Sequence, residues 1–161
     1  MSSIFGIFGA IYYWFPKMFG RMMNETLGKI HFALTFVGVY CIFMPMHYLG
    51  LHGDIRRYSA FTDEYMKGSI PLHRFITVAA LFTGAVQLLF LYNLVRSRFR
   101  GAPAPENPWQ ATTLEWATSS PPPFDNFDGH PPVVYRGPNE YGAPSPAGDF
   151  VMQNAPEPLP R

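Results

Sequence analysis

Two long stretches without charged side chains constrain this 161-residue chain more than any other feature. Residues 30–53 and 75–95 contain no Asp, Glu, Lys or Arg. An α-helix rises about 1.5 Å per residue, so roughly 20 apolar residues cross the hydrocarbon core of a bilayer. Each stretch therefore predicts a transmembrane helix, with expected bounds of about 29–52 and 72–96. Asn24 and the two residues after it have the residue types that begin a helix.

The N-terminal segment is apolar and aromatic but too short to span a bilayer. Residues 1–15 make about 22 Å of helix against a core of about 30 Å. They also lack the basic start and the small-residue cleavage site of a secretory signal. We expect a partial transmembrane helix over about 1–16, ended by Pro16, with the Tyr12–Trp14 cluster as an aromatic belt. The first half of such a helix would precede Met1, which indicates a fragment or a split gene.

The composition changes sharply after residue 100. The mean hydropathy of +0.01 averages an apolar region, 1–100, with a polar tail, 101–161, that holds 14 of the 17 prolines. Such a tail favours extended polyproline conformations, yet its spaced aromatic residues are unusual for a free linker. We expect residues 107–141 to dock on the surface of a larger assembly, and residues from about 142 to 161 to be mobile.

Basic residues near the helix ends predict the orientation in the membrane. The richer side, expected in the cytoplasm together with the tail, carries Lys17, Arg21, Lys29, Arg96, Arg98 and Arg100. The poorer side carries Arg56, Arg57, Lys67 and Arg74. With a net charge of +1 and no basic stripe, the chain does not have the charge pattern of a nucleic-acid-binding protein.

Several polar or small residues lie inside the predicted helices, and their residue types indicate what they do there. The single cysteine, Cys41, excludes an internal disulfide. His31, His47 and His52 do not share one helical face, so we expect packing or hydrogen bonding rather than metal binding. A second group is expected to meet neighbouring helices: Gln87 and Asn93 as polar residues, and Gly28, Ala33 and Gly38 as small residues that allow close approach by helices outside this chain.

Arg56 and Arg57 are the most chemically distinctive pair in the sequence. They follow the first long apolar stretch, at a membrane face. Guanidinium groups stay charged and can bind a carboxylate through two parallel hydrogen bonds. From the residues alone, two interpretations remain open: an interfacial anchor that reaches lipid headgroups, and a binding site for a carboxylate ligand.

The order of several short strings resembles subunit I of the haem-copper oxidases, over its last three transmembrane helices. The strings are Tyr-Trp-Phe-Pro at 13–16, Leu-Gly-Lys-Ile-His-Phe at 27–32, Phe-Met-Pro-Met-His-Tyr-Leu-Gly at 43–50 and Arg-Arg-Tyr at 56–58. The tail resembles the C-terminal extension of bacterial cytochrome c oxidases through Asn-Pro-Trp at 107–109, Thr-Leu-Glu-Trp at 113–116, Pro-Pro-Pro at 121–123 and Pro-Pro-Val-Val-Tyr-Arg-Gly-Pro at 131–138.

This resemblance implies an all-α membrane protein, the last helices of a twelve-helix bundle with an extended Pro-rich tail. The family reduces O2 to water with electrons from cytochrome c and pumps protons. Its haem and copper ligands lie on earlier helices, so no catalytic residue and no metal ligand is expected here, and the fragment alone should be inactive. Implied partners are the remainder of subunit I, subunits II and III, cytochrome c and the lipid bilayer of a bacterial inner membrane.

Within the family the arginine pair contacts the haem propionates, which implies that role for Arg56 and Arg57. One departure concerns the preceding residues: the family usually has Met-Pro, whereas this chain has Asp54-Ile55. A carboxylate at that position is expected to pair with an arginine and compete with the propionates. Two alternatives stay open for the whole protein, namely a quinol oxidase subunit I and a noncatalytic membrane scaffold.

Overall fold

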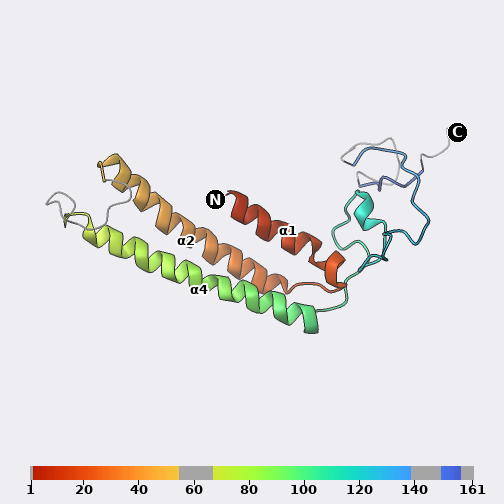
Figure 1. Cartoon of the computed structure of the whole chain (residues 1–161), viewed down its shortest axis with the longest axis horizontal. Helices are drawn as coiled ribbons and strands as arrows, with labels where there is room; N and C mark the ends of the chain where they lie inside the picture. Colours follow the sequence, from red (N-terminus) through yellow and green to blue (C-terminus); the bar gives the residue numbers. More distant parts are fainter. Residues whose placement is uncertain (1, 55–66, 139–149, 157–161) are drawn as a thin grey trace. The chain divides into compact units, whose positions relative to one another are not determined.

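The computed structural model describes residues 2–54, 67–138 and 150–156, and it is helical (Figure 1). Within these ranges the elements are α1 (Ser2–Phe19), α2 (Glu25–Leu51), α4 (Ile70–Arg100) and a short 3-10 turn, η1 (Leu114–Trp116). The described residues contain no β-strand, which confirms the helical class. The chain divides into two compact units, one of residues 24–96 and one that joins residues 1–23 to 97–161.

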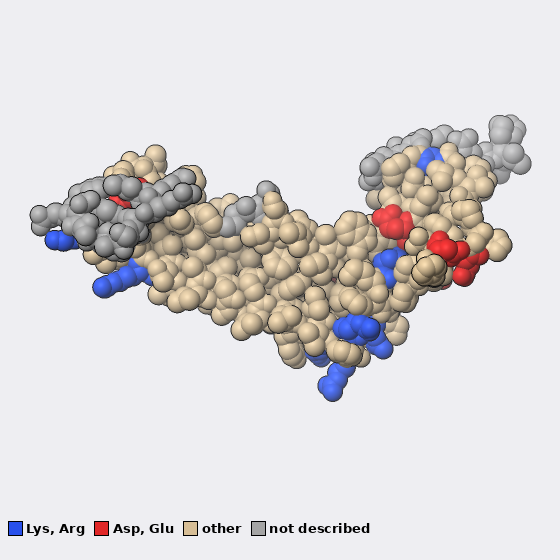
Figure 2. Space-filling model, in the orientation of Figure 1, with Lys and Arg blue, Asp and Glu red and all other residues tan. Residues whose placement is uncertain are grey.

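The unit of residues 24–96 is a pair of long apolar helices lying side by side (Figure 1). By length and composition, α2 and α4 can each cross a membrane. Only 17% of the most apolar stretch of α2 and 11% of that of α4 is buried within the chain. Figure 2 shows the long middle of this pair without charged side chains on the face drawn. Such surfaces are stable in contact with lipid or further helices rather than water.

The start of α2 is fixed by hydrogen bonds to α4. Asn24 is the N-cap, and its side chain accepts a hydrogen bond from the backbone N–H of Leu27 at 2.9 Å. Asn93 of α4 is fully buried. Its Oδ1 accepts from the Asn24 N–H at 3.2 Å, and its Nδ2 donates to the Asn24 carbonyl at 3.0 Å. The expected helix start at Asn24 and the expected interhelical role of Asn93 are both confirmed.

Gly38 marks a close approach of α2 to α4. A Cβ added at this glycine would overlap the hydroxyl of Thr83 and lie 3.1 Å from the Thr83 Cβ. The hydroxyl of Thr83 donates to the carbonyl of Ala79 at 2.7 Å, which holds the threonine in place. Gly38 therefore permits close packing, as predicted. The neighbour is α4 of the same chain, however, and not a helix from elsewhere.

Pro16 lies inside α1 and does not end it, in contrast to the sequence prediction. The helix continues to Phe19 and ends at Gly20, which has a φ of +63°. The N–H of Gly20 donates to the carbonyl of Pro16 at 2.8 Å. A proline removes one backbone donor, but the helix after it closes on a glycine that adopts the left-handed conformation without a Cβ penalty.

The tail folds back on α1 within the second unit. Trp116 is 1% exposed, and its Nε1 donates to the hydroxyl of Tyr13 at 2.8 Å. Trp109 donates through Nε1 to the carbonyl of Tyr13 at 2.9 Å. The rings of Trp109 and Tyr13 are stacked, with 6.1 Å between their centres. Docking of the tail was expected, but this docking surface belongs to the chain itself. Tyr13 accordingly contacts two tail tryptophans, and its expected role in an aromatic belt stays a prediction.

Lys17 also contributes to the contact between α1 and the tail, through its ammonium group. Its Nζ donates to the carbonyls of Thr118 at 2.7 Å and Ser119 at 3.2 Å, and it lies 5.0 Å from the centre of the Trp116 ring. Burial lowers the pKa of Lys17, while the carboxylates of Glu106 and Glu115 oppose that shift. The basic residue at the end of α1 therefore binds the tail.

Gln153 joins distant parts of the tail. Its N–H donates to the carbonyl of Thr112 and its carbonyl accepts from Tyr135, both at 2.9 Å. Its side chain accepts from the N–H of Leu114 at 3.1 Å and donates to the carbonyl of Arg136 at 3.4 Å. Residues 150–156 were expected to be mobile, and these contacts correct that expectation. The other residues of that expectation, 142–149 and 157–161, lie outside the described residues.

Replacing Gly38 tests the close approach of α2 and α4. Gly38→Ala is expected to destabilise the solubilised protein by about 1–3 kcal/mol, because the new methyl group collides with Thr83. Gly84→Ala is the matched control, since a Cβ there meets nothing within 4 Å. Thermal unfolding followed by circular dichroism measures both. Equal unfolding midpoints for the two variants would contradict the close contact.

Removing the hydroxyl of Tyr13 tests the docking of the tail. Tyr13→Phe leaves the buried indole N–H of Trp116 without its acceptor, a loss of about 1–3 kcal/mol. The tail is then expected to be cleaved faster by chymotrypsin. Tyr40→Phe is the matched control on α2, where the side chain is 53% exposed. A Tyr13→Phe tail as resistant as that of the parent protein would argue against this hydrogen bond.

Candidate functional site

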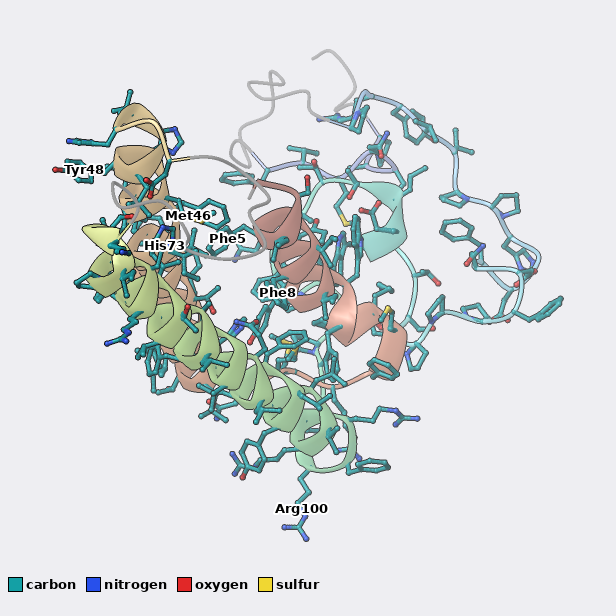
Figure 3. All side chains as sticks on the ribbon, turned by 60° about the vertical axis from the view of Figure 1, so that its left-hand side comes forward. Phe5, Phe8, Met46, Tyr48, His73 and Arg100 are labelled. Carbon is teal, nitrogen blue, oxygen red and sulfur yellow. The ribbon has the colours of Figure 1, made fainter. Side chains whose placement is uncertain are left out.

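Arg56 and Arg57, the predicted site residues, lie outside the described residues, so their role stays a prediction. The described residues nearest to them in the sequence are Asp54 and Lys67. The C-terminal end of α2 and the N-terminal end of α4 lie next to each other, and Figure 3 shows His73 at the start of α4, beside the last turns of α2 that carry Met46 and Tyr48. These two helix ends flank the segment that carries the arginines.

The end of α2 is closed by a Schellman motif. Gly53 has a φ of +88°, a left-handed conformation that favours glycine. Its N–H donates to the carbonyl of Gly50 at 3.2 Å, and the N–H of Asp54 donates to the carbonyl of Leu49 at 3.1 Å. Leu49 is 5% exposed. This pattern of two hydrogen bonds fixes the backbone up to Asp54.

The carboxylate of Asp54 pairs with the imidazole of His73. Nε2 of His73 lies 3.1 Å from Oδ2 of Asp54, and the two side chains are 19% and 7% exposed. His73 itself is anchored in the first turn of α4, where its N–H donates to the carbonyl of Ser69 and its carbonyl accepts from the hydroxyl of Thr77. Asp54 was expected to pair with Arg56 or Arg57, which lie outside the described residues; among the described residues its carboxylate pairs with His73.

The remaining histidines form no metal centre in the described ranges. His31 is buried, His47 is exposed, and His52 lies beside the carbonyl of Tyr48, with 3.0 Å between Nδ1 and that oxygen. In residues 2–54, 67–138 and 150–156, no three His, Cys, Asp or Glu side chains converge as they must to hold a metal ion. The described histidines therefore form no site with three converging protein ligands for a metal ion.

A polar network joins α2 and α4 between their ends. His31, 2% exposed, has its Nε2 3.0 Å from Oε1 of Gln87. The amide nitrogen of Gln87 donates to the hydroxyl of Thr35 at 3.3 Å and to the carbonyl of Thr83 at 2.9 Å. The prediction that Gln87 faces a neighbouring helix is confirmed, as is hydrogen bonding for His31. Each of these side chains is satisfied within the pair, which is the arrangement expected of a structural contact.

Sequence reasoning assigned no role to His73, which the structure pairs with Asp54, two residues before the predicted site in the sequence. A signal was available: a carboxylate directly after a helix-ending glycine, and a histidine in the first turn of the next helix. Both belong to the same membrane face, where an unpaired carboxylate next to apolar surroundings is costly. The distance along the chain hid the pairing, because nineteen positions separate the two residues.

Comparison with known proteins identifies related sequences. The family of cytochrome c and quinol oxidase polypeptide I matches residues 1–82. An alternative cytochrome c oxidase subunit 1 of Bradyrhizobium diazoefficiens is 49% identical over 161 residues, which covers 98% of this chain and 27% of that protein. Cytochrome c oxidase subunit 1 of Synechocystis sp. is 46% identical over 88% of this chain and 25% of its own length.

A quinol-oxidising relative is similar as well. Cytochrome bo(3) ubiquinol oxidase subunit 1 of Buchnera aphidicola is 41% identical over 83% of this chain and 20% of its own length. The chain therefore spans about a quarter of the length of these curated relatives. The chain is thus similar to subunits of both cytochrome c and ubiquinol oxidases.

A double-mutant cycle tests the contact between His31 and Gln87. We expect a coupling of about 0.5–2 kcal/mol between His31→Phe and Gln87→Leu, the range of hydrogen bonds between membrane helices. The measurement is the free energy of unfolding of the solubilised protein for the parent, both single variants and the double variant. Gln87→Leu combined with His47→Phe is the control and should be additive. Additivity for the His31 pair as well would contradict a direct contact.

Proposed function

This chain belongs to the family of cytochrome c and quinol oxidase polypeptide I, and we propose that it is the C-terminal portion of a bacterial cytochrome c oxidase subunit I. In the assembled enzyme this subunit would serve the reduction of O2 to water with electrons from cytochrome c, coupled to proton pumping. Because the chain spans about a quarter of its relatives, we assign that activity to the assembly and expect none of the chain alone.

One observation carries this proposal. The identity of 49% with an alternative cytochrome c oxidase subunit 1 extends over 98% of the chain, so it includes the Pro-rich tail as well as the helices. The two apolar helices with their largely open surfaces support placement in a membrane and contact with further helices. We propose that α1, α2 and α4 are the last three helices of a twelve-helix bundle, with subunits II and III as neighbours, and that the tail is cytoplasmic in a bacterial inner membrane.

Arg56 and Arg57 are proposed to bind the haem propionates on the outer face. When bound, the haem supplies electron transfer, and its axial ligands must come from protein outside this chain. Two fixed guanidinium groups would neutralise the propionates and hold them through paired hydrogen bonds. The nearby positive charge would also favour the reduced haem, which carries one positive charge fewer, and so raise its reduction potential.

The close alternative is a quinol oxidase, favoured by the similarity to a ubiquinol oxidase subunit 1. Purified complex containing this chain distinguishes the two donors. We expect it to oxidise reduced cytochrome c in the presence of O2 and not ubiquinol. Oxidation of ubiquinol alone would assign it to the quinol enzymes. Recovery of the chain from membranes without any haem protein would instead support a noncatalytic scaffold.

Neutralising the arginines tests the proposed propionate site. Arg56→Gln and Arg57→Gln in the full oxidase should each lower the haem reduction potential by tens of millivolts, because about 1 kcal/mol of lost charge interaction equals about 40 mV for one electron. Spectroelectrochemical titration measures the shift. Arg74→Gln, an exposed arginine in the first turn of α4, is the matched control. Unchanged potentials for both arginine variants would rule out this role.

A further inference from the structure

The chain just after α1 is joined to the chain just after α4 by a short backbone contact, which has no role in the function proposed above. The N–H of Met22 donates to the carbonyl of Ala102 at 2.8 Å. The N–H of Ala104 donates to the carbonyl of Gly20 at 3.0 Å. Because the two hydrogen bonds run in opposite directions between the same segments, they fix both segments and the side chains next to them.

Two arginines beside this contact are oriented by neutral groups. Nη1 of Arg21 donates to the carbonyl of Gly101 at 2.7 Å. The guanidinium carbon of Arg98 lies 4.9 Å from the centre of the Phe19 ring and 5.8 Å from that of the Phe99 ring. An aromatic face attracts a cation without neutralising it. Both guanidinium groups are therefore positioned while they keep their full charge.

No carboxylate of the described ranges compensates these two charges. Within residues 2–54, 67–138 and 150–156, neither Arg21 nor Arg98 forms an ion pair. Arg98 is exposed and Arg21 is partly exposed. A guanidinium group has five N–H donors, and the Gly101 carbonyl uses one of those of Arg21. The two side chains thus present most of their donors, and two positive charges, to an anion.

Exposed apolar side chains accompany the arginines. Phe99 is 71% exposed, and Trp14 and Met18, four positions apart on α1, are 45% and 52% exposed. Arg98 follows the uncharged stretch of residues 75–95 by three positions, which in a membrane-spanning helix is the level of the headgroups. A phospholipid fits such a surface, because it offers a phosphate and acyl chains together.

We propose that Arg21 and Arg98 bind the phosphate of an anionic phospholipid at the cytoplasmic face of the membrane, with its acyl chains beside the exposed ring of Phe99. Guanidinium groups bind phosphate oxygens through parallel N–H donors, and this geometry is stronger than that of a single ammonium group. The inference rests on the membrane placement proposed above. It does not depend on the haem site or on the electron donor.

The test is the affinity of the delipidated full oxidase for phosphatidylglycerol, with phosphatidylcholine as the reference lipid without net charge. Native mass spectrometry measures both affinities. The parent complex should bind phosphatidylglycerol more tightly. Arg21→Gln and Arg98→Gln should each weaken that binding about fivefold and leave the affinity for phosphatidylcholine unchanged. Arg98→Lys keeps the charge but not the planar fork, so it should weaken binding less than Arg98→Gln.

Arg100→Gln is the matched control, because it removes the same charge from the same helix end. Side chains two positions apart on a helix point in different directions, and Figure 3 shows Arg100 directed away from the ribbon. This variant should bind phosphatidylglycerol like the parent. The haem spectrum of each variant shows whether the complex is assembled. If Arg98→Gln fails to assemble, Arg98→Lys and Arg21→Gln provide the comparison.

Three results would overturn the inference and leave the oxidase assignment intact. The first is equal affinity of the parent for the two lipids. The second is an equal loss in Arg100→Gln and Arg98→Gln, which would indicate a general basic surface instead of a site. The third is loss of a neighbouring subunit from Arg98→Gln with unchanged lipid affinity, which would assign the arginine to a protein contact. Recovery of the chain outside the membrane fraction would contradict both the inference and the proposed function.

Discussion

The helix pair depends on the rule that polar groups inside an apolar environment must satisfy one another. Lipid offers no hydrogen-bond partner, so an unpaired amide or imidazole in such a region is costly. In the pair α2–α4, the side chain of Gln87 satisfies its polar groups through hydrogen bonds with His31, Thr35 and the carbonyl of Thr83. Gly38 lets α2 pack closely against Thr83 of α4. Close packing and hydrogen bonding are thus two parts of one arrangement.

The second unit uses a different kind of contact. In the described part of the tail, η1 is the one regular element. These residues are stabilised by aromatic side chains that contact α1 and by side chains that bind backbone groups. The carbonyl and the hydroxyl of Tyr13 each accept a hydrogen bond from a tail indole N–H, and Lys17 donates hydrogen bonds to two tail carbonyls. Gln153 connects Thr112, Leu114, Tyr135 and Arg136. A Pro-rich chain can be ordered in this way without a hydrophobic core of its own.

The features predictable from the sequence are those with a local cause. An uncharged stretch as long as residues 75–95 leaves few structures other than a membrane helix, and an asparagine before Glu25 is a strong start signal. The rule that a proline ends a helix was wrong at Pro16, because α1 continues to Phe19 and ends at Gly20. The aromatic tail indicated docking but not its surface, since the choice of partner depends on where α1 lies. The contact of Asp54 with His73 requires knowing how two helix ends meet, which no local pattern encodes.

The pairing of α1 with the tail has a consequence for biosynthesis. The hydroxyl of Tyr13 and the indole of Trp116 are separated by 103 residues, and both apolar helices are translated between them. The ribosome must therefore complete α2 and α4 before the unit containing α1 can close. Long loop closure of this kind is slow compared with helix formation. Until residues 109–119 have been synthesised, Tyr13 and Lys17 at the end of α1 lack the tail partners that they have in the folded unit.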